Sequence, residues 1–296
     1  MGATSPTGRL DMPVLEELSM GGVHFRESYV VPYPQAPLPP KLRYLTLTDY
    51  DSQNIPFSVF DFVTALITCK NLFRLHLKNL RLDISDTGTS SPRQPPWNYN
   101  FGFNLDFTDM SGDVIAELNR LLQYVLADSA SYTCCSMPIR NTFPLWCVCD
   151  AFRVSFVDIA SPMVLVNLLA GEASYREVLI SRSDGLQSEV LHALTTPMAT
   201  EHGGVDWPCP HLRELHINSC KQFSSKDLRD MLEARLKAHE ETEFAMEDDG
   251  ADFVLRSVTE LYVHDCGELA PDDKEWFDKN VERVQWDDWR GGTEWP

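Results

Sequence analysis

The chain has 296 residues, of which 43% are hydrophobic and 10% aromatic, so it can bury a substantial core, which argues against global disorder. Its formal charge of −19 repels nucleic acid and anionic lipid, and we expect neither a nucleic-acid nor a membrane partner. Eight cysteines in a chain of this length are too few for a disulfide scaffold. An intracellular location, in the cytoplasm or the nucleus, fits better.

The ends of the chain are expected to be tails. Residues 1–11 have no apolar core that could serve as a signal sequence, and no later stretch approaches the roughly 20 apolar residues that a membrane span needs. We therefore expect a soluble chain with a disordered tail over residues 1–10, a single domain over residues 11–290, and a C-terminal tail over residues 291–296.

A short pattern recurs along the chain. Apolar residues occupy positions one, four and six of the segments that begin at Leu72, Leu212 and Val258. The same spacing recurs in four more segments, which begin at Leu15, Leu42, Ala151 and Tyr175. The fourth and sixth residues lie on the same side of a strand, because side chains alternate along it. The pattern is that of a leucine-rich repeat, whose strands stack side by side in a parallel sheet.

Two cysteines strengthen this prediction. Leucine-rich repeats place Asn or Cys three positions beyond the last apolar residue, and Cys220 and Cys266 stand there. Alternating apolar residues predict two further strands, over 101–107 and over 281–286.

Between the strands, the apolar residues recur with a helical period. The predicted helices cover residues 57–69, 114–126, 163–169, 188–194 and 226–241, and a further helix begins at Pro271. For 226–241 the expected N-cap is Ser224 or Ser225. Its expected buried stripe consists of Leu228, Met231, Leu232 and Leu236.

The repeats are unevenly spaced, and loops are expected between them. A proline-rich linker is predicted over 29–40, a surface loop over 85–100 and an acidic loop over 243–252. The fold class expected from these features is α/β, as an irregular leucine-rich repeat solenoid. It would form a horseshoe arc like that of ribonuclease inhibitor, with the parallel sheet on the concave face and the helices on the convex face.

The residues resemble the leucine-rich repeat regions of fungal F-box proteins, particularly the divergent basidiomycete set. The resemblance rests on CPHLRELHI at 209–217 followed by Cys220, and on LYVHDCG at 261–267 followed by Trp276-Phe277 and by WDDW at 286–289. It covers most of the chain and is strongest after Trp207. In that family an N-terminal F-box binds the adaptor of a cullin-RING ubiquitin ligase while the repeats hold a substrate.

This resemblance extends to the repeats and not to the F-box. A repeat already begins at Leu15, so the ubiquitin-ligase adaptor is expected as a partner only if an F-box is supplied upstream. We therefore expect a non-enzymatic protein-protein interaction scaffold, similar to the substrate-recognition region of such a subunit. The alternative is a truncated or decayed repeat protein without a dedicated partner.

The outward residues of the strands are the candidate contacts with a protein partner. They are Arg43, Tyr44, Phe73, Arg74, His76, Arg213, Glu214, His216, Glu260 and Tyr262. Aromatic and arginine side chains carry much of the binding energy at protein interfaces. We expect His76 and His216 to be contact residues rather than metal ligands.

The C-terminal part of the chain is strongly acidic. From residue 239 to residue 296 there are 18 acidic and five basic residues, a net charge of −13. One hypothesis is a solvated cap that prevents self-association, and the other is an acidic docking surface for a basic partner. The candidate docking residues are Asp272, Asp273, Asp287, Asp288 and Trp289. Trp276 and Trp286 are expected in a capping core, and Trp295 is left as a possible contact.

Two clusters contain residue types found in metal or catalytic sites. Cys134-Cys135 and Cys147-Cys149 lack the usual spacing of zinc ligands, and the acidic run at 247–252 lacks the ligand pattern of a calcium loop. We therefore expect no metal and no cofactor.

His264, Asp265 and Cys266 are the residue types of a thiol hydrolase, but they are sequence neighbours that the repeat explains. We expect no catalytic residues, and a thiol hydrolase would require an accessible Cys266.

Overall fold

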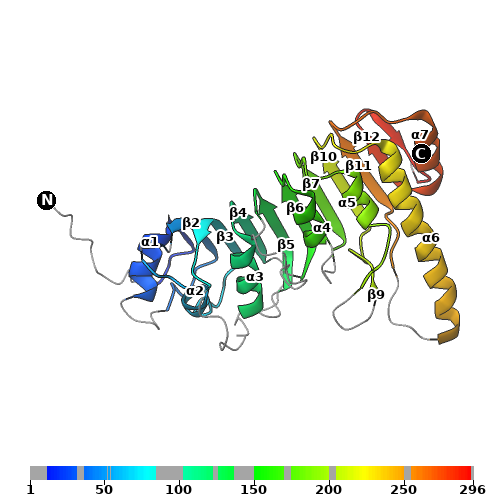
Figure 1. The fold of residues 1–296 in the computed structure, drawn as a ribbon. Helices are drawn as coiled ribbons and strands as arrows, with labels where there is room; N and C mark the ends of the chain where they lie inside the picture. The colour runs from blue at the N-terminus through cyan, green and yellow to red at the C-terminus, as the bar shows by residue number, and fades with distance from the viewer. Residues whose placement is uncertain are drawn as a thin grey trace. The chain divides into compact units, whose positions relative to one another are not determined.

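The structure is a computed structural model that describes residues 12–31, 37–51, 53, 55–84, 103–122, 126–136, 150–169, 175–199, 205–249 and 255–294. The chain divides into two compact units, residues 1–130 with 135–149, and residues 131–134 with 150–296. Each is an α/β unit with a mostly parallel sheet and helices (Figure 1). A single domain over residues 11–290 stays a prediction.

The first unit contains short helices and a sheet in the order β1-β2-β3-β4-β5. Its elements are β1 (Glu17–Gly21), α1 (Gly22–Phe25), a π-helical turn η1 (Arg26–Val30), β2 (Tyr44–Asp51), α2 (Val59–Leu66), β3 (Arg74–Arg81), β4 (Asn104–Thr108), α3 (Gly112–Leu121) and β5 (Leu126–Thr133). The strand pairs β1–β2, β2–β3 and β3–β4 are parallel. Residues of β5 after Ala130 are assigned to the second unit.

The second unit repeats the alternation of strand and helix. Its elements are β6 (Asp150–Val157), α4 (Pro162–Leu169), β7 (Glu177–Ser181), α5 (Ser188–Ala193), β8 (Met198–Ala199), β9 (Val205–Asp206), β10 (Glu214–Asn218), α6 (Ser225–Asp249), β11 (Glu260–His264), α7 (Pro271–Asn280), β12 (Arg283–Trp286) and β13 (Trp289–Gly291). The sheet order is β6-β7-β10-β11-β12-β13, and only β13 runs antiparallel to its neighbour. β8 and β9 form a separate hairpin.

The apolar positions of the sequence pattern build the core. Leu45 and Leu47 of β2 are 1% exposed, and Leu215 and Ile217 of β10 are 2% and 1% exposed. In each unit helices lie along one face of the sheet (Figure 1). The other face carries most of the polar side chains of the strands together with some apolar and aromatic ones, such as Leu179 and Tyr44.

One backbone conformation recurs at the ends of most strands of the two sheets. A left-handed φ angle, which disfavours most residues other than Gly, Asn and Asp, occurs once within or just after each of β2 to β7 and β10 to β12. These residues are Asp49, Asn79 and Asp109 in the first unit, and Cys134, Asp158, Arg182, Ser219, Asp265 and Asp287 in the second. Several donate their backbone N–H to the next strand, as Ser219 does to the His264 carbonyl at 2.9 Å. The repeated bend directs the following residue inward, as with buried Cys220.

All nine predicted strands and all six predicted helices correspond to elements of the structure, with shifted ends. The helix predicted over 114–126 ends at Leu121, and β5 begins at Leu126. Residues 243–249, predicted as a loop, continue α6. The predicted tail at 291–296 is wrong at Gly291, which is buried in β13. Segments 85–102 and 137–149, with Cys147 and Cys149, lie outside the described residues, as does Trp295.

The buried stripe of α6 differs from the prediction at one position. Leu228, Met231 and Leu232 are buried as expected, but Leu236 is only half-buried and Arg235 is fully buried. In the described parts of the chain, no helix is both long and apolar enough to cross a bilayer.

Candidate functional site: a polar cluster on the second sheet

The most organised polar surface lies on the outward face of the second sheet. Strand register places one residue from each of five neighbouring strands in a row across this face. The row consists of Arg153, Glu177, Glu214, Glu260 and Arg283, from β6, β7, β10, β11 and β12. Three carboxylates therefore stand side by side between two arginines.

The outer carboxylates of this row are paired with the arginines. Arg153 Nε lies 2.7 Å from Glu177 Oε2, and Arg283 donates to Glu260 at 3.2 Å. The middle carboxylate, Glu214, lies 2.6 Å from His216 Nε2 on the same strand. Because neighbouring parallel strands are about 4.8 Å apart, three adjacent carboxylates repel one another and Glu214 bears that repulsion from both sides.

A second row, two residues further along the strands, adds an aromatic pair. His216 of β10 is the register partner of Tyr262 of β11. Their rings stack with centroids 4.5 Å apart and an angle of 12° between the planes. The Tyr262 hydroxyl donates to Glu260 Oε2 at 2.7 Å. Burial first, and then this hydrogen bond, raise the pKa of Tyr262 to about 12, so the phenol stays protonated and remains a donor.

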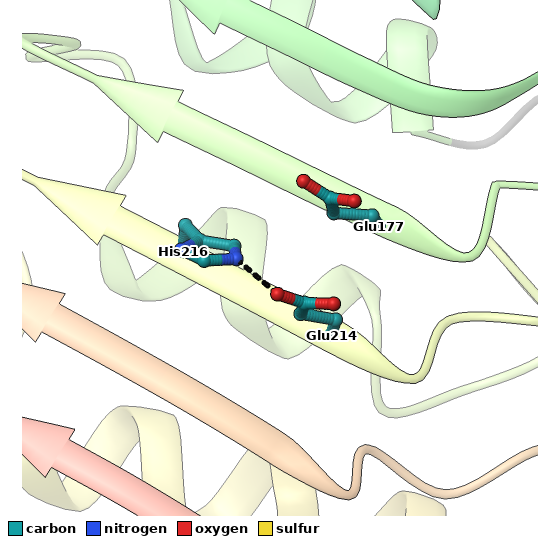
Figure 2. Close-up of side chains that lie close together, drawn as sticks. All are labelled: Glu177, Glu214 and His216. Atoms are coloured by element: carbon teal, nitrogen blue, oxygen red, sulfur yellow. Dashed lines mark hydrogen bonds and ion pairs between the residues drawn. The ribbon is translucent and has the colours of Figure 1, made fainter. Parts of the chain in front are cut away.

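Three possible metal ligands converge within this cluster (Figure 2). Single ligand atoms of Glu177, Glu214 and His216 all lie within 4.8 Å of one another. Glu177 faces Glu214 across the β7–β10 pair, and His216 follows Glu214 two residues later on the same face. All three side chains are half-buried.

The predicted contacts of the first unit form a separate cluster on its own sheet. Tyr44 and Phe73 pack edge to face with ring centroids 5.7 Å apart, and the Arg43 guanidinium lies 5.6 Å from the Phe73 centroid. Arg74 donates to Asp106 at 2.5 Å, and His76 lies 3.3 Å from the Thr108 hydroxyl. On this face His76 lies opposite Asp106 of β4, whose carboxylate is paired with Arg74, and the ring nitrogen of His76 lies against Thr108 instead of a carboxylate.

The predicted acidic docking surface is only partly assembled. Asp272 and Asp288 are exposed, and Trp289 is half-buried with Lys274 Nζ 5.0 Å from its ring centroid. Asp287 accepts the Asp265 backbone N–H at 2.7 Å, so part of its role is to hold the turn after β11.

The placement of Asp273 on that surface is wrong. Its carboxylate is buried. There it accepts a hydrogen bond from Ser225 at 2.6 Å, and the Arg229 guanidinium lies 3.4 Å away. The capping role expected of Trp286 agrees with its burial, whereas Trp276 is half-buried.

Cys266, the thiol that a hydrolase would need as its nucleophile, lies in an unfavourable setting. Burial raises the pKa of Cys266, whereas a thiol nucleophile needs a lowered pKa. Cys266 Sγ donates to the His264 backbone carbonyl at 3.2 Å, while the His264 ring lies against Asp287 at 3.3 Å. This arrangement gives no support for a thiolate at Cys266.

The site contains three residues that sequence reasoning missed: Arg153, Glu177 and Arg283. Each occupies position three of the repeat, as Glu214 and Glu260 do, directly before the apolar residue at position four. The frame itself was therefore the signal that could have found them. Searches against protein-family models, curated proteins and solved structures found no match for this chain.

Proposed function

We propose that this chain is an intracellular, non-enzymatic leucine-rich repeat scaffold that binds a protein partner on the outward face of the second sheet. The observation that carries the proposal is the assembly of four predicted contact residues into one cluster. Glu214, His216, Glu260 and Tyr262 come from two adjacent strands and are linked by a stack and two hydrogen bonds.

The side chains of this cluster are already held in place before a partner binds. Side chains held in place by strand pairing and by each other lose little conformational entropy on binding, which leaves more of the contact energy for affinity. Tyr262 offers a rigid aromatic surface, and two arginines are exposed: Arg213, directly before β10, and Arg283 of β12. Tyrosine and arginine are the residue types enriched at the centres of protein interfaces.

The resemblance to F-box repeat regions suggests one class of partner. A substrate held by such repeats would be a protein, and the ubiquitin-ligase adaptor would bind only through an F-box supplied upstream. A truncated or decayed repeat protein would keep the fold but bind no dedicated partner.

The test compares affinity captures by the full chain and by two variants with matched changes. Arg213→Glu with Tyr262→Ala alters the second sheet, and Arg43→Glu with Phe73→Ala alters the first. We expect a specific set of proteins to be captured by the wild type and the first-sheet variant and lost by the second-sheet variant. Equal capture by all three folded chains would contradict the proposal. Adaptor and cullin among the captured proteins would support ligase membership.

A further inference from the structure

We propose that Glu177, Glu214 and His216 form a binding site for a single Zn²⁺ ion on the outward face of the second sheet (Figure 2). This inference goes beyond the protein partner proposed above and does not rest on it. It also departs from the expectation, drawn from the sequence, that His216 is a contact residue and not a ligand.

The three ligand atoms lie close together. His216 Nε2 and Glu214 Oε1 are 2.6 Å apart, and all three atoms lie within 4.8 Å of one another. Tetrahedral Zn²⁺ with bonds of about 2.0–2.2 Å holds its ligand atoms roughly 3.3 Å apart. One separation is shorter than this value and the others are at most 4.8 Å, so the three atoms are close enough together to share one ion after their side chains rotate.

All three ligands come from two neighbouring strands, β7 and β10. Strand pairing fixes Glu177 opposite Glu214, and strand alternation fixes Glu214 and His216 on one face. Ligands on strands are held more precisely than ligands on loops. Three protein ligands leave a fourth position, on the solvent side, for water.

Negative charge gathers at the centre of the row. Glu177, Glu214 and Glu260 are adjacent in one row, and the arginines at the ends of the row neutralise only the outer two. The Glu214 carboxylate instead lies against the His216 imidazole. A dication between Glu177 and Glu214 would relieve the repulsion at the centre of the row. The imidazole nitrogen in the donor set favours Zn²⁺ over Mg²⁺ or Ca²⁺, which prefer oxygen ligands.

Side chains of β11 and β12 support the His216 imidazole. Tyr262 stacks on the His216 ring and is held by Glu260, which is held in turn by Arg283. Residues behind a ligand that fix its orientation are typical of metal sites. Tyr262 is a positioning residue, because it would orient His216 without touching the metal.

The test is a titration of the full chain, stripped with a chelator and kept reduced, against Zn²⁺ alone in competition with a chromophoric chelator. We expect one tight site per chain. His216→Ala, Glu214→Gln and Glu177→Gln should each weaken it at least about tenfold, while His76→Ala, the matched histidine of the first sheet, should not change it. Arg153→Ala should tighten binding about twofold, because it frees the Glu177 carboxylate.

Two further measurements test the positioning role of Tyr262 and distinguish this site from Zn²⁺ binding by cysteine thiolates. Tyr262→Leu should weaken Zn²⁺ binding, whereas Tyr262→Phe should leave it unchanged because the ring stack remains. Co²⁺ in place of Zn²⁺ should show tetrahedral visible absorption without the near-ultraviolet charge-transfer band of thiolate ligands. Circular dichroism checks that each variant is folded. A thiolate band, or binding unaffected by both His216→Ala and Glu214→Gln, would overturn the proposal, as would the absence of Zn²⁺ binding to the wild type.

Discussion

The imidazole of His216 stacks on the phenol ring of Tyr262, with centroids 4.5 Å apart and planes at 12°. These residues are partners in the β10–β11 register and lie 46 positions apart in the sequence, the difference between 262 and 216. The stack joins a hydrogen-bonded pair on β10, Glu214 and His216, to another on β11, Glu260 and Tyr262. Four side chains on two strands therefore act as one unit.

The raised pKa of Tyr262 predicts a loss of stability at high pH. The pKa of a tyrosine in the unfolded chain is about 10 and that of Tyr262 in the folded chain is about 12, so the folded state holds this proton more tightly. The stabilisation is complete below pH 10 and is lost as the pH rises from 10 to 12. Urea denaturation should therefore show a wild-type advantage over Tyr262→Phe at pH 8 that shrinks as the pH rises above 10. A constant difference would contradict the assignment.

A buried arginine should be essential for the turn that leads into β10. Arg235 is fully buried and donates to the carbonyls of Pro208 and Cys209 at 2.9 and 2.8 Å. Burial lowers its pKa to about 10, so it remains charged at neutral pH. Arg235→Ala removes both hydrogen bonds and leaves a cavity, and we expect it to lower the free energy of unfolding by about 3 kcal/mol.

The control for Arg235 is Lys237→Ala on the same helix. The Lys237 side chain is 77% exposed, so its removal should change the denaturation midpoint little. Equal effects of the two substitutions would show that Arg235 does not hold the turn. Arg235→Met, which keeps much of the volume, should fall between them.

The buried carboxylate of Asp273 should stabilise the contact between α6 and α7. It accepts from Ser225 at 2.6 Å, and the same hydroxyl accepts the Ala270 backbone N–H at 3.2 Å. Asp273→Asn should cost about 1–2 kcal/mol in the free energy of unfolding, because a charged acceptor is replaced by a neutral one in a buried network. Asp272→Asn, on the exposed neighbour, is the matched control and should be nearly neutral in thermal denaturation.

Exposed cysteines should react faster than buried ones. Burial raises the pKa of Cys209 to about 12 and that of Cys220 to about 11, so both remain protonated and shielded at pH 8. Cys134 is exposed. Iodoacetamide labelling of the native protein, followed by peptide mass spectrometry, should modify Cys134 much faster than Cys209 and Cys220. Comparable rates before unfolding would mean that these thiols are not in the core.

Trp286 should contribute more to stability than Trp276. The Trp286 side chain is buried, lies 6.0 Å from Phe277 between ring centroids, and donates its indole N–H to the Gly267 carbonyl at 3.0 Å. Trp286→Ala should cost about 3 kcal/mol or more, and Trp276→Ala, at a half-buried position, should cost clearly less. Thermal denaturation of both variants checks the order, and the reverse order would contradict the capping role of Trp286.

The sequence by itself determined the strands that carry leucine-type residues, because alternation and fixed spacing are local properties. It missed β5, where the same frame positions hold Ala127, Ala130 and Tyr132. Alanine has low strand propensity and high helix propensity, so local preference extended the preceding helix to residue 126. Pairing and burial in the sheet overrode that preference.

Alternation along β10 and β11 also predicted that Glu214, His216, Glu260 and Tyr262 face the same way. The repeat frame puts Glu177 at the same position as Glu214, but only the tertiary structure decided that the ligand atoms of Glu177, Glu214 and His216 converge to within 4.8 Å of one another. It also decided where charge is buried, as at Arg235 and Asp273, which sequence rules place at the surface. Such burial depends on hydrogen-bond partners that lie far away in the chain, and a local pattern contains no information about those partners.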